Sequence, residues 1–215
     1  MKDAEKFHIS PDDEPIGEGR KNIVYLDPLN ADHVIAFSKA EDKTSPNIVK
    51  GRYYLGKILH LLFPDNFADV HISSSEPEAT VRQNLNLEDT YVELQKLAIE
   101  SRAKGERVNP VRWKQLKDLR AENLPRSEIG KLTSRLASVG ITIGGAEINF
   151  ALGQDGNLKY AEIEEPFNAE KRFYNPDALQ KAIATLDDEA KEKAISYFKR
   201  LEVLYEQEKQ VPESK

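Results

Sequence analysis

The stretch of residues 140–167, GITIGGAEINFALGQDGNLKYAEIEEPF, constrains the fold of this chain more than any other. Ile148, Phe150 and Leu152 alternate with small or polar residues, and apolar positions resume at Leu158 after the turn. Asp155-Gly156 supplies the backbone conformations that a tight turn requires. The pattern predicts a β-hairpin with one buried face. Its two arms carry Asn149 and Glu162, which makes this hairpin the first place to look for a functional site.

Composition limits the classes of chemistry that remain. The chain has 215 residues, enough to bury a core without metal or disulfide support. It has no cysteine, which excludes a thiol nucleophile, a disulfide framework and a thiolate zinc site. The 31 basic and 37 acidic residues give a net charge of −6, which argues against a nucleic-acid partner. No apolar run reaches the roughly 18 residues of a membrane span, so we expect a soluble, cytoplasmic protein without a membrane partner.

The first third of the chain has the character of a small sheet with one helix. Short apolar runs around Ile23 and from Val34 to Phe37 predict strands. Gly17-Glu18-Gly19 precedes the first of them, and two glycines there permit either a plain turn or a turn whose backbone amides face a phosphate. Residues 44–63 predict a helix with Thr44 or Ser45 as its cap and Pro64 after its end. A short strand is expected over 69–73.

The composition then changes. Residues 73–83 are rich in Ser, Pro, Glu and Thr, which favours a hinge between two lobes, residues 1–75 and 76–215. Beyond it, helical periodicity predicts helices over about 88–104, from Pro110 and from Ser127, then the hairpin, then helices capped by Asn175 and Asp187. The expected fold class is therefore α+β, with a β-rich first lobe and a mainly helical second lobe that contains a hairpin.

This order of elements resembles the protein-kinase-like fold over roughly residues 14–205. The stretch IGEGRKNIVY resembles the glycine-rich loop, with Gly17 and Gly19 in the loop and Val24 at the position of the adenine-covering valine. HVIAFSK resembles the third strand, with Ala36 in its usual place, Ser38 at the position of the phosphate-binding lysine, and Lys39 one residue later. The resemblance implies that these six residues contact a nucleotide, with ATP as the expected cofactor.

The hairpin carries the most specific part of the resemblance. In kinases the catalytic-loop asparagine precedes the aspartate of the Asp-Phe-Gly motif by 13 residues, and Asn149 precedes Glu162 by the same interval. The family uses these two positions to hold Mg²⁺, and an amide oxygen with a carboxylate suits that ion. The resemblance therefore implies a Mg²⁺ site at Asn149 and Glu162. The alternative is that Asn149 only bridges the strand ends and Glu162 is solvated.

Other positions depart from the family in ways that affect catalysis. Gly144 stands where the family has its catalytic aspartate, Ala146 stands where a lysine is expected, and Ile163-Glu164 replaces Phe-Gly. The helix of residues 46–63 contains no acidic residue to pair with a lysine. We therefore expect a degenerate, pseudokinase-like domain that acts as a regulatory or interaction module with a protein partner.

Two alternatives stay open. One is an atypical small kinase or nucleotidyltransferase that uses Mg-ATP, with Lys39, Lys50 or Lys57 in place of the usual lysine. The other is an unrelated α+β protein in which the spacing matches by chance.

Overall fold

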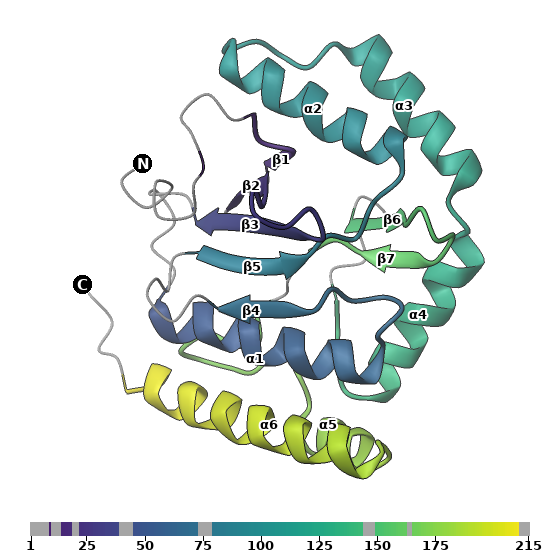
Figure 1. Ribbon diagram of the computed structural model, residues 1–215. Helices are drawn as coiled ribbons and strands as arrows, with labels where there is room; N and C mark the ends of the chain where they lie inside the picture. Colours follow the sequence, from purple (N-terminus) through teal and green to yellow (C-terminus); the bar gives the residue numbers. More distant parts are fainter. Residues whose placement is uncertain are drawn as a thin grey trace. The chain divides into compact units, whose positions relative to one another are not determined.

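The structure is a computed structural model of the whole chain, and it describes residues 9, 14–18, 22–38, 45–72, 79–143, 149–162 and 165–210. Several predicted positions lie outside these residues: Gly19 and Lys39 of the expected nucleotide site, and Gly144, Ala146 and Glu164 near the hairpin. The fold is α+β, with helices and small antiparallel sheets (Figure 1).

Five strands form the larger sheet, in the order β1-β2-β3-β5-β4. They are β1 (Gly17–Glu18), β2 (Asn22–Leu26), β3 (His33–Ser38), β4 (Val70–Ile72) and β5 (Ala79–Gln83). β2 and β3 pair antiparallel through a turn in which Asp27 and Asn30 hold the backbone, since the Leu29 amide donates to Asp27 Oδ1 and the Asp32 amide to Asn30 Oδ1. The predicted strands around Ile23 and over Val34 to Phe37 are confirmed.

One face of this sheet carries an apolar core. Ile35 is buried with Ile9, and Tyr25 and Phe37 pack against them with their rings edge to face at 6.0 Å. These strand residues occupy alternate positions, and the pleat sends alternate side chains to opposite faces. The other face therefore carries the intervening positions, among them Val24 and Ala36.

The interpretation of residues 73–83 as a hinge is wrong for its last five residues. Ala79–Gln83 form β5, which pairs antiparallel with β3 from His33↔Gln83 to Phe37↔Ala79. Thr80 and Val81 are β-branched and suit a strand, but the preceding Ser, Pro and Glu dominate the composition of the whole stretch. A partner strand far away in the sequence decides the structure here.

Helix α1 (Pro46–Leu62) follows β3 in the chain and matches its prediction closely. Ser45 is the cap, with its side chain accepting from the Asn47 amide, and Pro46 stands in the first turn. Leu55, Ile58 and Leu59 are buried. His60 is half-buried, with Nδ1 2.8 Å from the Phe67 carbonyl oxygen, so it lies at the edge of the core.

The remaining helices are α2 (Asp89–Ala103), α3 (Pro110–Asn123), α4 (Arg126–Ser138), α5 (Pro176–Ile183) and α6 (Asp188–Glu208). Asn109, Asn175 and Asp187 cap α3, α5 and α6 as predicted. Ser127, expected to open its helix, lies inside α4. The end of α6 is held to the start of α1, because the buried Glu208 carboxylate accepts hydrogen bonds from Ser45 Oγ at 2.5 Å and Asn47 Nδ2 at 3.1 Å.

The predicted hairpin is confirmed as β6 (Phe150–Leu152) and β7 (Leu158–Tyr160), with Gly156 at φ +77° in the turn. A third segment joins it: the Glu88 amide donates to the Leu152 carbonyl, and the Gln154 amide donates to the Asn86 carbonyl. Residues 86–88, which link β5 to α2, therefore line one edge of the hairpin.

The chain divides into two compact units. One contains β1, β2, β3, β5, α2, α3 and residues Ala151–Lys159, and the other contains α1, α4, α5 and α6. These units do not coincide with the predicted segments 1–75 and 76–215, because β5 pairs with β3 and α1 groups with α6. Within the described residues, no helix has the length and apolar character needed to cross a membrane.

Candidate functional site

Three of the predicted nucleotide-site residues form one row across the sheet. Gly17 on β1 is the Cα partner of Val24 on β2, and Val24 is the Cα partner of Ala36 on β3. Val24 is half-buried and Ala36 is buried. A Cβ added at Gly17 would lie 3.8 Å from Val24 Cβ, an ordinary contact. Packing against Val24 therefore does not itself require glycine at position 17.

The other three residues of the predicted set are described less fully. Ser38 is the Cα partner of Asn22 at the end of β3, two residues beyond Ala36 on the same strand. Gly19 and Lys39 lie outside the described residues.

The predicted metal residues lie at the open end of the hairpin. The Ala161 amide, directly before Glu162, donates to the Asn149 carbonyl oxygen at 2.8 Å. One residue further in, the rings of Phe150 and Tyr160 pack with centroids 5.2 Å apart, and both are buried. The buried pair fixes the register that places Ala161 opposite Asn149, with Glu162 one residue further along the chain. Asn149 is half-buried and Glu162 is exposed.

This donor set fits a hard cation only in part. An amide oxygen and a carboxylate are suitable ligands for Mg²⁺, which normally keeps several waters and takes further oxygens from phosphates. Among the described residues there is no group of three or more His, Cys, Asp or Glu that could hold a metal ion. The two residues therefore suit an ion that arrives with a phosphate ligand better than a metal site built by protein alone.

The structure also shows an ion pair that the sequence did not suggest. Arg52 on α1 donates to Glu165 at 2.7 Å, three residues beyond Glu162, and the Arg52 side chain is only 9% exposed. The neighbouring Gly51 lies close to the following residues, since a Cβ there would be 2.8 Å from Pro166 Cγ. Helix α1 thus holds the segment that leaves the hairpin. One feature of the sequence was consistent with this pair, namely the complementary charge between a helix without acidic residues and a run of glutamates.

The substitute lysines on α1 have different surroundings. Lys57 donates to Asp69 at 2.6 Å, and its side chain is 12% exposed. Lys50 is exposed. Lys57 is therefore held by a carboxylate of its own unit, while Lys50 lies at the surface.

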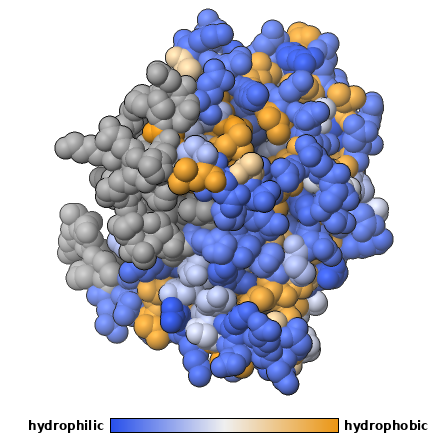
Figure 2. All heavy atoms as spheres, in the orientation of Figure 1, coloured by the Kyte–Doolittle hydropathy of each residue, from blue (hydrophilic) through white to orange (hydrophobic). Residues whose placement is uncertain are grey.

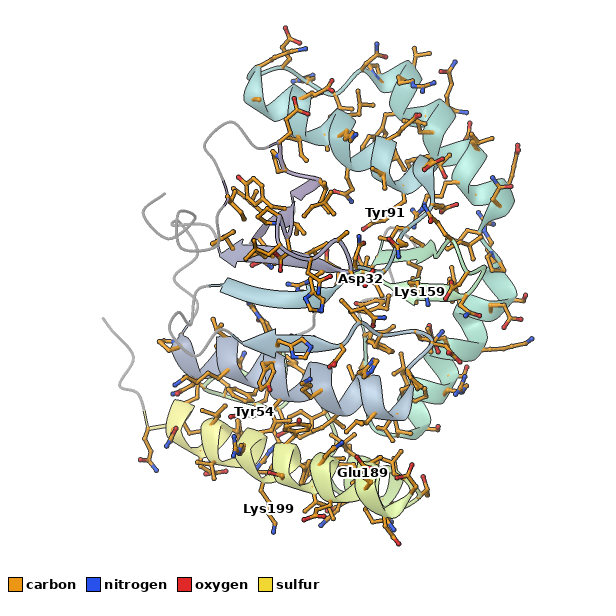
Figure 3. The ribbon with its side chains drawn as sticks, viewed as in Figure 1. Asp32, Tyr54, Tyr91, Lys159, Glu189 and Lys199 are labelled. Carbon is orange, nitrogen blue, oxygen red and sulfur yellow. The ribbon has the colours of Figure 1, made fainter. Side chains whose placement is uncertain are left out.

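Charged groups are also buried around the hairpin turn and the start of α2. Lys159 is buried and donates to Asp155 at 2.6 Å, and this hydrogen bond lowers the pKa of the Asp155 carboxyl. Arg120 of α3 is buried with its guanidinium 5.1 Å from the Tyr91 ring and Nε 3.7 Å from Glu88 Oε1. Figure 3 labels Tyr91 and Lys159.

Comparison with models of known protein families found none that matches this chain, and comparison with curated proteins likewise found no match. We therefore infer the function from the sequence and from the geometry of the described residues.

Proposed function

We propose that the chain is a kinase-like domain that binds a nucleotide without transferring phosphate and acts as a regulatory or interaction module. The observation that carries the proposal is the row Gly17–Val24–Ala36, formed by strand register on one sheet face. Small and aliphatic side chains on a flat sheet face suit an adenine ring, which is bound through its apolar faces.

The order of elements supports the same assignment. Along the chain, three strands, helix α1 and two further strands come first, and helices, a hairpin and more helices follow. The first five strands belong to one sheet. This is the order on which the resemblance to protein kinases rests. Asn149 and Glu162 at the hairpin end would supply an amide oxygen and a carboxylate for Mg²⁺, the ion that would shield the phosphates of a bound nucleotide.

We do not propose phosphoryl transfer, because other residues stand at the positions whose side chains would support it. Catalysis of this reaction depends on cations and a base placed around the transferred phosphate. Gly144 replaces the base, Ser38 replaces the lysine, and the basic residue Arg52 of α1 pairs with Glu165. These substitutions favour binding over turnover.

Thermal unfolding with and without Mg-ATP tests the proposal. We expect Mg-ATP to raise the melting temperature of the wild-type protein and Val24→Ser to abolish most of that rise. Leu26→Ser is the control and should retain the rise, because Leu26 lies on the same strand and face but is 49% exposed. Mg-ATP should raise the melting temperature more than ATP alone does. Glu162→Gln should remove this difference, whereas Glu170→Gln, at another exposed glutamate, should not.

An ATP-hydrolysis and phosphotransfer assay on the same samples separates the alternatives. A melting shift without turnover supports the proposal. Turnover that depends on Glu162 would instead establish an atypical kinase or nucleotidyltransferase using Mg-ATP. No shift with any nucleotide would leave only the interaction role.

A further inference from the structure

A cluster of tyrosines lies on one surface of the unit that contains α1 and α6. Tyr53 and Tyr54 of α1 have ring centroids 5.0 Å apart, and Tyr197 of α6 lies 6.3 Å from Tyr53 and 6.1 Å from Tyr54. All three are half-buried. Figure 3 labels Tyr54 on the side of α1 that faces α6. Because the rings of the two helices contact one another, they form one continuous surface.

Cationic side chains surround these rings at helical spacing. On α1, Lys50, Tyr53, Tyr54 and Lys57 follow at i, i+3, i+4 and i+7, and on α6, Lys193, Tyr197 and Arg200 follow at i, i+4 and i+7, so each set forms one stripe. Arg200 Nη1 donates to the Tyr54 hydroxyl oxygen at 3.3 Å. We call this surface the tyrosine patch, and it comprises Lys50, Tyr53, Tyr54, Lys57, Lys193, Tyr197 and Arg200.

The patch is not the face through which these helices bury their core. That role belongs to residues such as Leu55, Ile58 and Leu59 on α1 and Ala194, Leu201 and Leu204 on α6. Tyrosine and arginine are the residue types most enriched among energetically dominant positions of protein interfaces. A surface cluster of three tyrosines with arginine is therefore better suited to recognition than to packing.

The charges indicate the kind of partner. Two carboxylates reach the patch, Asp69 paired with Lys57 at 2.6 Å and Glu189 paired with Lys193 at 2.7 Å. The Lys193–Glu189 pair is exposed, and such surface pairs contribute only about 0–1 kcal/mol, so an incoming carboxylate can replace Glu189 at little cost. Lys50 and Arg200 are exposed. These groups complement an anionic partner.

Ring geometry decides between an acidic protein and a nucleic acid. Stacking of bases requires open aromatic faces. Here Lys57 lies over the Tyr53 ring at 6.0 Å and Arg200 over the Tyr54 ring at 5.7 Å, and the rings are tilted against one another. Carboxylates, in contrast, can accept from the exposed cations and the tyrosine hydroxyls.

We propose that the tyrosine patch binds an acidic peptide segment of a partner protein. This inference goes beyond nucleotide binding and does not depend on it, because none of the seven residues belongs to the proposed nucleotide or metal site. It assigns the interaction role to a defined surface, with Tyr54 and Arg200 at its centre and the lysines at its rim.

Fluorescence anisotropy with a short labelled peptide of glutamate and phenylalanine, in the absence of nucleotide, tests the proposal. We expect saturable binding that is lost when glutamine replaces each glutamate of the peptide. Arg200→Glu should weaken binding by about tenfold, and Tyr54→Phe should weaken it less while preserving the rings. Lys199→Glu is the matched control, because Lys199 is exposed on α6 and points away from α1 (Figure 3).

Three results would overturn the proposal. Equal weakening by Arg200→Glu and Lys199→Glu would indicate non-specific charge attraction. Tighter binding of a single-stranded oligouridylate than of the peptide would assign the patch to nucleic acid. Absence of binding by the folded wild-type protein, with circular dichroism as the check of folding, would leave the tyrosines as packing at the α1–α6 margin.

Discussion

Gly51 shows how a single residue can set the approach of two segments. A Cβ at this position of α1 would lie 2.8 Å from Pro166 Cγ and 2.9 Å from the Phe167 ring, closer than real Cβ contacts. Phe167 is fully buried, so its ring has little room to move. The absence of a side chain at Gly51 lets α1 contact the segment that carries Glu165, and places Arg52 within reach of it.

Gly51→Ala is therefore expected to destabilise the protein by about 1–3 kcal/mol, the range for overpacking a filled core. The matched control is Gly130→Ala in α4, where nothing lies within 4 Å of the added Cβ. Alanine is the better helix former by about 1 kcal/mol, so this variant should be stabilised. Urea unfolding of the two variants measures the difference, and a stabilised Gly51→Ala would show that the contact with Pro166 is not tight.

Another residue-scale arrangement lies between the 165–175 segment and α6. Arg172 donates to Glu202 at 2.7 Å, lies 4.0 Å over the Tyr205 ring, and Tyr174 also donates to Glu202. Burial, followed by the hydrogen bond to Glu202, raises the pKa of Tyr174, so the phenol remains protonated and a donor. This network ties the segment after the hairpin to α6 of its own unit.

At the scale of elements, the hairpin turn contains a titratable contact. Lys159 and the Asn157 amide both donate to Asp155, and the Lys159 hydrogen bond is the main cause of its lowered pKa. A carboxyl whose pKa is lower in the folded state stabilises that state above its unfolded pKa of about 3.9 and loses the effect as pH falls through the folded pKa.

Asp155→Asn should therefore lower stability at pH 6 and have little further effect once the wild-type carboxyl is protonated, well below pH 4. The effect at pH 6 should be modest, because the Asp155 side chain is 49% exposed and solvent screens the pair. Urea midpoints of both proteins at the two pH values give the comparison. A difference between the proteins that stays constant across this range would mean that the lost contact is not electrostatic.

Elements set by local interactions were predictable from the sequence. Asn109, Asn175 and Asp187 accept hydrogen bonds from backbone amides two or three residues ahead, and Gly156 provides a positive φ within its own turn. Elements set by distant partners were not. β5 depends on β3, residues 86–88 depend on the hairpin, and the order at the end of α6 depends on Ser45 and Asn47.

The same distinction applies to the candidate site. The hairpin turn determines which positions face each other, and it places Ala161, the residue before Glu162, opposite Asn149. The row of Gly17, Val24 and Ala36 follows from two strand registers of neighbouring segments. The Arg52–Glu165 pair joins residues far apart in sequence, and no local pattern marks it.

At the scale of the whole molecule, the two proposals concern different parts of the chain. We propose nucleotide binding at the sheet face that carries Gly17, Val24 and Ala36, and contact with an acidic partner at the tyrosine patch. On the face shown in Figure 2, hydrophobic residues are scattered among hydrophilic ones, so recognition on that face depends on polar and aromatic groups more than on a broad apolar surface.

The central claim is that a nucleotide lies against the row Gly17–Val24–Ala36. The most direct measurement is methyl NMR during titration with Mg-ATP, since an adenine ring shifts the resonances of methyl groups beneath its face. The account predicts saturable shifts of the Val24 and Ala36 methyl groups, with the Leu26 methyl groups at the far end of β2 unchanged. Unshifted Val24 and Ala36 methyl groups at saturating Mg-ATP would contradict it.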